Sequence, residues 1–217
     1  MKKGFTLAET LITLGIIGVV AAITIPGLIA KYRANVLDAQ FKEQYSRLSQ
    51  ALKSLVDEED ISLVPNDLRG NFINYVKKHY RIAQDCGNIN IGTTGCIRLN
   101  SEGAIDEYKT YTGKTIQFAY LDDGMLILND GTTLFFEQGE QSRALGYYMI
   151  GIDINGYKNK PNRLGHDLFV FKIGENGELQ YPLGFNECNK TSTSGNNGYG
   201  CAKKAIQDKN YFKNLPK

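Results

Sequence analysis

The first thirty residues constrain the fold of this chain more than any other stretch. Lys2 and Lys3 are followed by an apolar run from Phe5 to Ala30 in which Glu9 is the only charged residue. A helix over residues 5–30 would be about 39 Å long at roughly 1.5 Å per residue, enough to cross a hydrocarbon core of about 30 Å. A lone carboxylate is costly to bury in such a core. The sequence therefore predicts a membrane-spanning helix containing one charge that needs a partner.

Two ordinary interpretations of this segment fail. A secretory signal peptide has an apolar core of about 7–15 residues that ends at a small-residue cleavage site. Here the run is too long, and Ala21 and Ala22 lie inside it. A plain membrane anchor fits the length but explains neither Glu9 nor the junction between Gly4 and Phe5.

The same segment carries a more specific pattern. It reads KGFTLAETLITLGIIGVVAAITIP: a short basic leader ending in Gly4, then Phe-Thr-Leu-x-Glu, then an apolar helix with Pro26 near its far end. In these features it resembles the N-terminus of the type IV prepilin and type II secretion pseudopilin family. The resemblance covers about thirty of the 217 residues.

The resemblance implies a processing site and a set of partners. In that family a membrane-bound prepilin peptidase cuts after the glycine, here between Gly4 and Phe5, and the new amino group on Phe5 is usually methylated. The family's glutamate, here Glu9, pairs with the N-terminal ammonium of a neighbouring subunit in the filament. The implied partners are other pilin or pseudopilin subunits, the prepilin peptidase, an inner-membrane assembly platform and membrane lipid.

Glu9 also has a simpler role open to it. Thr6-x-x-Glu9 is the spacing of a capping box, and the helix dipole favours an acid in the first turn. The two roles are compatible. Capping alone gives no reason to hide a charge in lipid, so we favour pairing between subunits, where attraction in a low dielectric offsets the burial of both charges.

These features divide the chain into four parts. We expect a leader at residues 1–4, a transmembrane helix at 5–30, an amphipathic continuation of that helix at 31–57 and a globular domain at 58–217. In the continuation, apolar residues recur at steps of three and four, with charged residues between them. This apolar stripe consists of Leu37, Phe41, Tyr45, Leu48, Leu52 and Leu55. The basic leader favours a cytoplasmic N-terminus, which predicts a single pass through the bacterial inner membrane with the globular domain outside the cytoplasm.

The globular part has the pattern of short strands joined by tight turns. Asp122-Asp123-Gly124 and Asn129-Asp130-Gly131 separate β-prone runs and are typical of hairpins. A meandering antiparallel sheet with one apolar face needs a cover, and the apolar stripe is the available one. The predicted fold class is therefore α+β and pilin-like, with a long N-terminal helix packed on an antiparallel sheet. The expected strands are residues 115–121, 125–128, 132–137, 147–154, 167–173 and 178–181.

Four cysteines bracket two short loops. Cys86 and Cys96 enclose one turn-forming segment, and Cys188 and Cys201 enclose another. Neither pair has metal-ligand spacing, and disulfides are permitted outside the cytoplasm. Of the three possible pairings we favour the local one, in which each closed loop contributes roughly 3 kcal/mol in the chain-entropy model. Many pilin-like proteins carry a disulfide-closed C-terminal loop, so the second pair also fits the resemblance.

One loop offers oxygen ligands for a metal. Asp153-x-Asn155-Gly156 has the spacing that starts a calcium loop. Asp167 lies where the next strand could close the site, with Asn162 and backbone carbonyls helping. The later acidic ligands of an EF-hand are missing, and an Asx-turn loop that uses these residues only for its geometry is the alternative. Some major pseudopilins carry a calcium site in their C-terminal region, so the resemblance supports Ca²⁺, which is the one cofactor considered.

The rest of the sequence favours a structural role. Twenty-five basic side chains balance 23 acidic ones, which does not suit a nucleic-acid-binding surface. The sequence contains no recognisable catalytic set, so no enzyme activity is expected. We expect a pseudopilin or minor pilin, a subunit of a type II secretion or type IV pilus-like filament assembled through its hydrophobic helix. The alternative is a membrane-anchored extracytoplasmic binding protein that does not polymerise.

Overall fold

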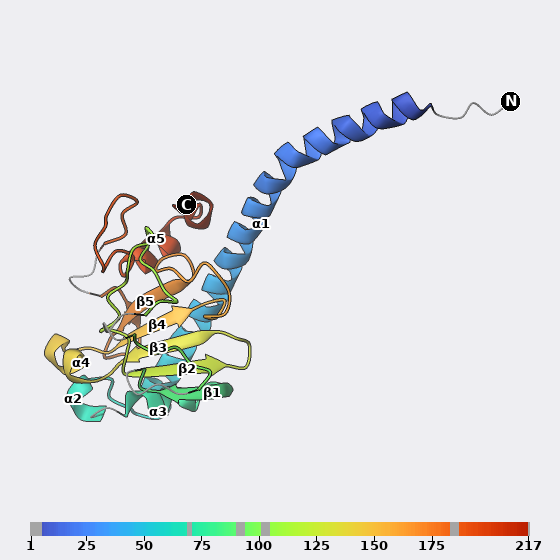
Figure 1. The fold of residues 1–217 in the computed structure, drawn as a ribbon. Helices are drawn as coiled ribbons and strands as arrows, with labels where there is room; N and C mark the ends of the chain where they lie inside the picture. The colour runs from blue at the N-terminus through green and yellow to red at the C-terminus, as the bar shows by residue number, and fades with distance from the viewer. Residues whose placement is uncertain (1–5, 69–70, 90–93, 101–104, 183–186, 217) are drawn as a thin grey trace.

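The computed structural model describes residues 6–68, 71–89, 94–100, 105–182 and 187–216. Its longest element is helix α1, Leu7–Asp57, whose first half extends away from the globular part (Figure 1). Pro26 lies inside α1 without ending it. The helix ends where the acidic run begins, with the Glu58 N–H donating to the Ser54 carbonyl at 3.0 Å. The prediction of one continuous helix with two different halves is confirmed.

The globular part is built on a six-stranded antiparallel sheet. Its strands lie side by side in chain order, which is the predicted meander. The strands are β1 (Ile82–Gly87), β2 (Gly124–Leu128), β3 (Thr133–Glu137), β4 (Met149–Asp153), β5 (Leu168–Ile173) and β6 (Leu179–Gln180). The smaller helices are α2 (Pro65–Leu68), α3 (Phe72–Lys77), α4 (Glu140–Leu145), α5 (Cys201–Gln207) and the 3₁₀ helix η1 (Tyr211–Asn214).

The amphipathic half of α1 covers one face of this sheet. Phe41, Leu48, Leu52 and Leu55 from the apolar stripe are each at most 2 % exposed. They join a core cluster with alternate residues of the central strands, including Ile150 and Ile152 of β4. The ring of Phe41 lies 4.4 Å from that of Phe169 on β5 and 5.7 Å from that of Phe212 in η1, measured between centroids. The predicted cover for the sheet is confirmed.

The opposite face of the sheet is also buried, which the sequence analysis did not predict. Residues 105–121 pack there without regular secondary structure. The Phe118 ring lies 5.1 Å from that of Phe135 on β3, and the Tyr108 ring lies 5.5 Å from it. All five residues of both β3 and β4 are consequently buried.

One strand assignment was wrong, and one strand was missed. Residues 115–121 form no strand, because the Gln117 N–H donates to the Gly195 carbonyl (3.0 Å) rather than to a sheet neighbour. Asp122-Asp123-Gly124 is therefore not a hairpin turn. In its place the sheet has β1, a polar edge strand with two register irregularities that carries little apolar signal. The expected turn at Asn129-Asp130-Gly131 does join β2 to β3.

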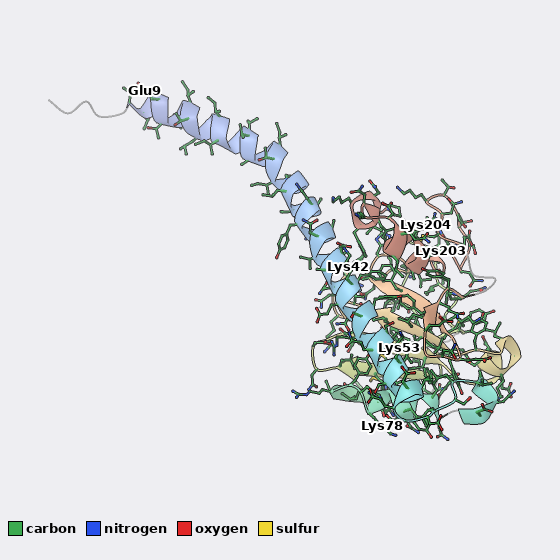
Figure 2. The ribbon with its side chains drawn as sticks, turned by 180° about the vertical axis from the view of Figure 1, so that it is seen from behind. Glu9, Lys42, Lys53, Lys78, Lys203 and Lys204 are labelled. Atoms are coloured by element: carbon green, nitrogen blue, oxygen red, sulfur yellow. A yellow bond between two sulfur atoms is a disulfide. The ribbon has the colours of Figure 1, made fainter. Side chains whose placement is uncertain are left out.

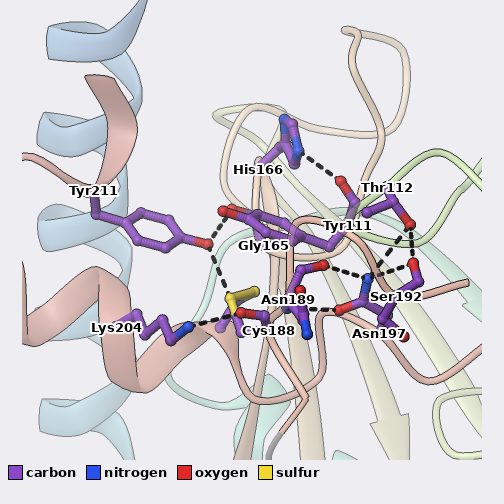
Figure 3. Close-up of a disulfide and its surroundings, with 11 residues drawn as sticks. Tyr111, Thr112, Gly165, His166, Cys188, Asn189, Ser192, Asn197, Lys204 and Tyr211 are labelled. Carbon is purple, nitrogen blue, oxygen red and sulfur yellow. Dashed lines mark hydrogen bonds between the residues drawn. A yellow bond between two sulfur atoms is a disulfide. The ribbon is translucent and has the colours of Figure 1, made fainter. Parts of the chain in front are cut away.

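Both local disulfides are confirmed. Cys86 bonds Cys96, with a Cα–Cα distance of 5.9 Å, and Cys188 bonds Cys201, at 4.9 Å. The second bond closes the loop between Cys188 and Cys201 and lies close to Gly165 (Figure 3). There Tyr211 Oη donates to the Gly165 carbonyl at 2.6 Å. Gly165 has φ +73°, and a Cβ on it would lie 2.6 Å from Cys201 Sγ, so this contact requires glycine.

Truncating the helix at the sheet should destabilise the globular part. We expect Phe41→Ala to lower the free energy of unfolding by about 3–5 kcal/mol, because it empties a site surrounded by aromatic rings. Ile17→Ala is the matched control, since Ile17 is 63 % exposed on the same helix. Denaturant unfolding of the full chain in detergent measures both. Equal effects of the two changes would contradict the assigned packing.

Candidate functional site

The N-terminal half of α1 exposes apolar side chains around its whole circumference. Leu7 is 80 % exposed, Leu14 61 % and Ile23 75 %. Among the residues that the structure describes, α1 is the one helix long and apolar enough to cross a membrane. Soluble monomers rarely expose a continuous apolar surface of this size, so this half is built to contact lipid or other apolar helices.

Glu9 lies in the first turn of this helix, at the end far from the globular part (Figure 2). It forms the capping box: its Oε2 accepts from the Thr6 N–H and from Thr6 Oγ1, both at 2.8 Å. The Glu9 N–H in turn donates to Thr6 Oγ1 at 3.3 Å. Both side-chain bonds use Oε2, which leaves Oε1 for another donor. The capping role is thus present in the single chain, while pairing between subunits stays a prediction.

The predicted processing residues Gly4 and Phe5 lie outside the described residues. Phe5 immediately precedes Thr6, which is the N-cap of α1. A cut before Phe5 would therefore place a new ammonium next to the first turn that contains Glu9.

The predicted calcium residues lie together around the loop from β4 to β5. Asp153 is fully buried; its Oδ1 accepts from the backbone N–H groups of Asn155 (3.2 Å) and Gly156 (2.9 Å). Its Oδ2 accepts from the hydroxyl of Tyr108. Burial, followed by the charge of Asp167, raises the pKa of Asp153 well above its ordinary value. These contacts are those of an Asx turn, the alternative interpretation of this loop.

Asp167 closes the loop in the same way. Its two carboxylate oxygens accept from the backbone N–H groups of Asn162 and Arg163, each at 2.7 Å. Burial raises the pKa of Asp167 to about 6. A cation bound in this loop would lower the free-energy cost of burying two ionised carboxylates there.

Two amide oxygens of this loop have no hydrogen-bond partner among the residues that the structure describes. Asn155 Oδ1 and Asn162 Oδ1 are both buried, and Asn162 is 1 % exposed. Calcium prefers carboxylate and amide oxygens, so the donor set fits this ion in kind. The calcium site on Asp153, Asn155 and Asp167, with Asn162 as a helping ligand, stays a prediction, and the two orphaned oxygens support it.

Sequence reasoning missed a second acidic cluster. One carboxylate oxygen from each of Asp122, Asp123 and Glu137 lies within 4.8 Å of the others. Asp123 Oδ2 accepts from the N–H groups of Gln138 (2.8 Å) and Gly139 (2.6 Å), so it shapes the turn from β3 into α4. Burial and the neighbouring Asp123 raise the pKa of Glu137 to about 7. Asp122-Asp123 looked like a turn in the sequence, and nothing in the sequence placed Glu137 beside it.

Comparison with known proteins assigns one part of the chain. Residues 1–25 match the family model described as "Prokaryotic N-terminal methylation motif". No curated protein and no solved structure matches the chain. The match covers the segment in which Glu9 and the processing residues lie, and it confirms the resemblance drawn from the sequence.

Neutralising Glu137 should change how stability depends on pH. A carboxyl whose pKa rises on folding favours the folded state below its unfolded pKa, and this contribution is lost as the pH rises toward the folded pKa. Wild type should therefore lose stability between about pH 4.5 and pH 7 relative to Glu137→Gln, by on the order of 1–2 kcal/mol. The amide of the variant can still donate to Asp123. Unfolding curves at several pH values measure the difference, with exposed Glu140→Gln as control; a constant difference across this range would contradict the assignment.

Calcium should stabilise the wild-type globular part if the β4–β5 loop binds it. Saturation at about 100 times Kd adds about 2.7 kcal/mol by mass action. Asn162→Gly keeps the positive φ of 53° and both carboxylates but removes one orphaned oxygen, so its response to calcium should be weaker. Thermal unfolding with calcium, magnesium or chelator measures this. An unchanged wild-type Tm in calcium would contradict the site.

Proposed function

We propose that this chain, which carries the type IV prepilin-like signal in residues 1–25, is a filament subunit of the pseudopilin or minor pilin class. The signal indicates a type IV pilin- or pseudopilin-type precursor that is processed by a prepilin peptidase and assembles with pilin subunits. Together with the long apolar helix it also indicates a membrane-anchored protein. The finer proposal is a structural subunit, without a catalytic step, of a type II secretion or type IV pilus-like filament.

The observation that carries this proposal is the form of α1. One half packs on the sheet. The other half presents mainly apolar side chains, with Glu9 as its one charged residue and three threonines whose hydroxyls donate to the helix backbone. Such a helix suits two environments in turn. It can lie in the bacterial inner membrane, and it can pack against the same helix of other subunits in a filament core, because both surroundings are apolar.

Glu9 supplies what apolar packing lacks, which is a fixed register. Apolar helices slide past one another at little cost, whereas a buried charge is stable only opposite a partner of opposite sign. After a cut before Phe5, the ammonium of a neighbouring subunit is the partner proposed here. In this account the globular part lies outside the cytoplasm, and an inner-membrane assembly platform extracts the processed subunit into the filament.

Separating the two roles of Glu9 tests the proposal. Thr6→Ala removes the hydroxyl of the capping box but keeps the charge, whereas Glu9→Ala removes the carboxylate of the capping box together with its charge. If pairing between subunits drives assembly, Glu9→Ala should reduce incorporation into filaments at least about tenfold, and Thr6→Ala only slightly. Incorporation is measured as the sheared filament fraction relative to the membrane pool, with exposed Glu43→Ala as control.

The two variants also define the contrary result. Equal losses in Thr6→Ala and Glu9→Ala would leave Glu9 with the capping role alone. Wild-type incorporation of Glu9→Ala would contradict the pairing of Glu9 between subunits. Absence of the unmodified chain from the filament fraction would favour a membrane-anchored binding protein that does not polymerise.

A further inference from the structure

Basic side chains gather at the end of the globular part from which the apolar half of α1 emerges. We name six of them the basic collar: Lys31 and Arg33 on α1, Lys158 and Lys160 in the β4–β5 loop, and Lys209 and Lys213 in the C-terminal segment. All six are exposed. They come from three segments far apart in the sequence, so the fold, not the local sequence, gathers them.

The α1 members mark the end of the apolar run. Residues 10–30 carry no charge, and Lys31-Tyr32-Arg33 follows directly. Residues 7–30 span about 36 Å at roughly 1.5 Å per residue, slightly more than the hydrocarbon core of a bilayer. Lys31 and Arg33 then lie at the level of the lipid headgroups. Tyr32, 69 % exposed, has the amphipathic ring that is enriched at this level.

The β4–β5 loop lies against this part of the helix and forms a groove with it. The groove has a volume of about 740 Å³. Tyr32 and Arg33 line it from α1, and Asn159 and Lys160 line it from the loop. The groove thus has a cation on each side, Arg33 from α1 and Lys160 from the loop, and such cations bind phosphate groups.

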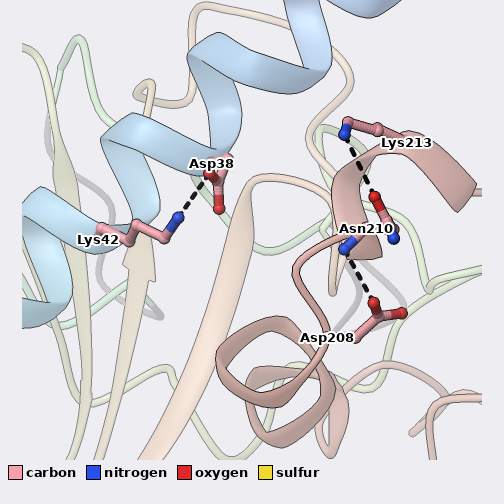
Figure 4. A network of polar contacts seen from close by, with 5 residues as sticks. All are labelled: Asp38, Lys42, Asp208, Asn210 and Lys213. Carbon is pink, nitrogen blue, oxygen red and sulfur yellow. Dashed lines mark hydrogen bonds and ion pairs between the residues drawn. The ribbon is translucent and has the colours of Figure 1, made fainter.

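The C-terminal segment brings the other two cations to the same end. Phe212 packs on Phe41 of α1, and the segment lies beside the emerging helix (Figures 1 and 4). Lys213 Nζ donates to the neutral Asn210 Oδ1 at 3.2 Å. Lys209 lies one residue before Asn210.

The acidic groups near the collar are engaged elsewhere. Asp38 pairs with Lys42 at 2.6 Å, and Asp130, which lines the groove, pairs with Arg47. Asp208 accepts from the Asn210 N–H at 2.8 Å (Figure 4). Within the described part of the chain, none of the six collar residues takes part in an ion pair. The collar is therefore a local surplus of positive charge in a chain whose net charge is only +2.

We propose that the basic collar binds anionic phospholipid headgroups, with one phosphate held in the groove between Arg33 and Lys160. This rests on the proposed function, because it requires α1 to be in a membrane. The contact would hold the globular part against the bilayer surface until the subunit is extracted. Each basic residue near an anionic surface strengthens binding roughly fivefold, so six together should favour anionic over neutral lipid strongly.

A second copy of the chain is the competing occupant. The far end of the globular part carries Asp57-Glu58-Glu59-Asp60, which could face the collar of another subunit. The lipid is favoured because the collar begins immediately after the apolar run and includes an exposed interfacial tyrosine. Both features match a bilayer surface, and neither is needed for contact with an acidic protein end.

Hydrogen exchange of the full chain in nanodiscs tests the proposal. The discs contain either phosphatidylcholine alone or phosphatidylcholine mixed with phosphatidylglycerol. Amides of residues 155–163 should exchange more slowly in the anionic discs, and raised salt should remove the difference. The double variant Lys158→Gln/Lys160→Gln should weaken the contact of the globular part with the anionic disc surface about 25-fold, at roughly fivefold for each cation.

The matched control is Lys53→Gln/Lys78→Gln, the same charge change at the opposite end of the globular part (Figure 2). It should keep wild-type protection, since the exposed pair of Lys78 with Glu59 contributes little to stability. Equal protection in neutral and anionic discs would overturn the proposal. So would protection that rises with the number of chains per disc at fixed lipid composition, which would assign the collar to a second copy. A chain that does not insert into either disc would instead overturn the proposed membrane span.

Discussion

The structure depends on the contact between the amphipathic half of α1 and the first face of the sheet. That contact fixes the direction in which the apolar half leaves the globular part. The aromatic group formed by Phe41, Phe169 and Phe212 joins helix, sheet and C-terminal segment at one point. The same helix continues past Pro26 into the apolar half, so one helix and not an irregular linker joins the two halves.

Charge is distributed along this axis in a consistent order. Glu9 lies at the tip, the basic collar lies where the helix meets the globular part, and the acidic run Asp57–Asp60 lies at the far end. The buried acids Asp153, Asp167 and Glu137 are of another kind. Their oxygens accept backbone N–H groups, so they fix turns between strands, and their raised pKa values are the cost of that burial.

The sequence predicted what local periodicity and turn chemistry determine. The α1 stripe and the turn at Asn129-Asp130-Gly131 follow from spacing that any short window contains, whereas the disulfides were the favoured choice among three possible pairings. Residues 115–121 show where such prediction fails. Their alternating apolar side chains pack on one face of the sheet, but their backbone does not pair with a strand. β1 was missed because an edge strand needs few apolar residues. The cluster around Glu137 was missed because its acidic partners come from another segment of the chain. Glu9 was found from the sequence because a single charge in an apolar run needs no fold to stand out.

The proposed assembly depends on one cation, the α-ammonium of Phe5, because it is the partner of opposite charge that we propose for Glu9 in the filament core. Mass spectrometry of the protein from cells with an active prepilin peptidase tests this directly. We predict a chain that begins at Phe5 and carries one added methyl group on its amino terminus. A chain that still begins at Met1 in those cells would contradict the account.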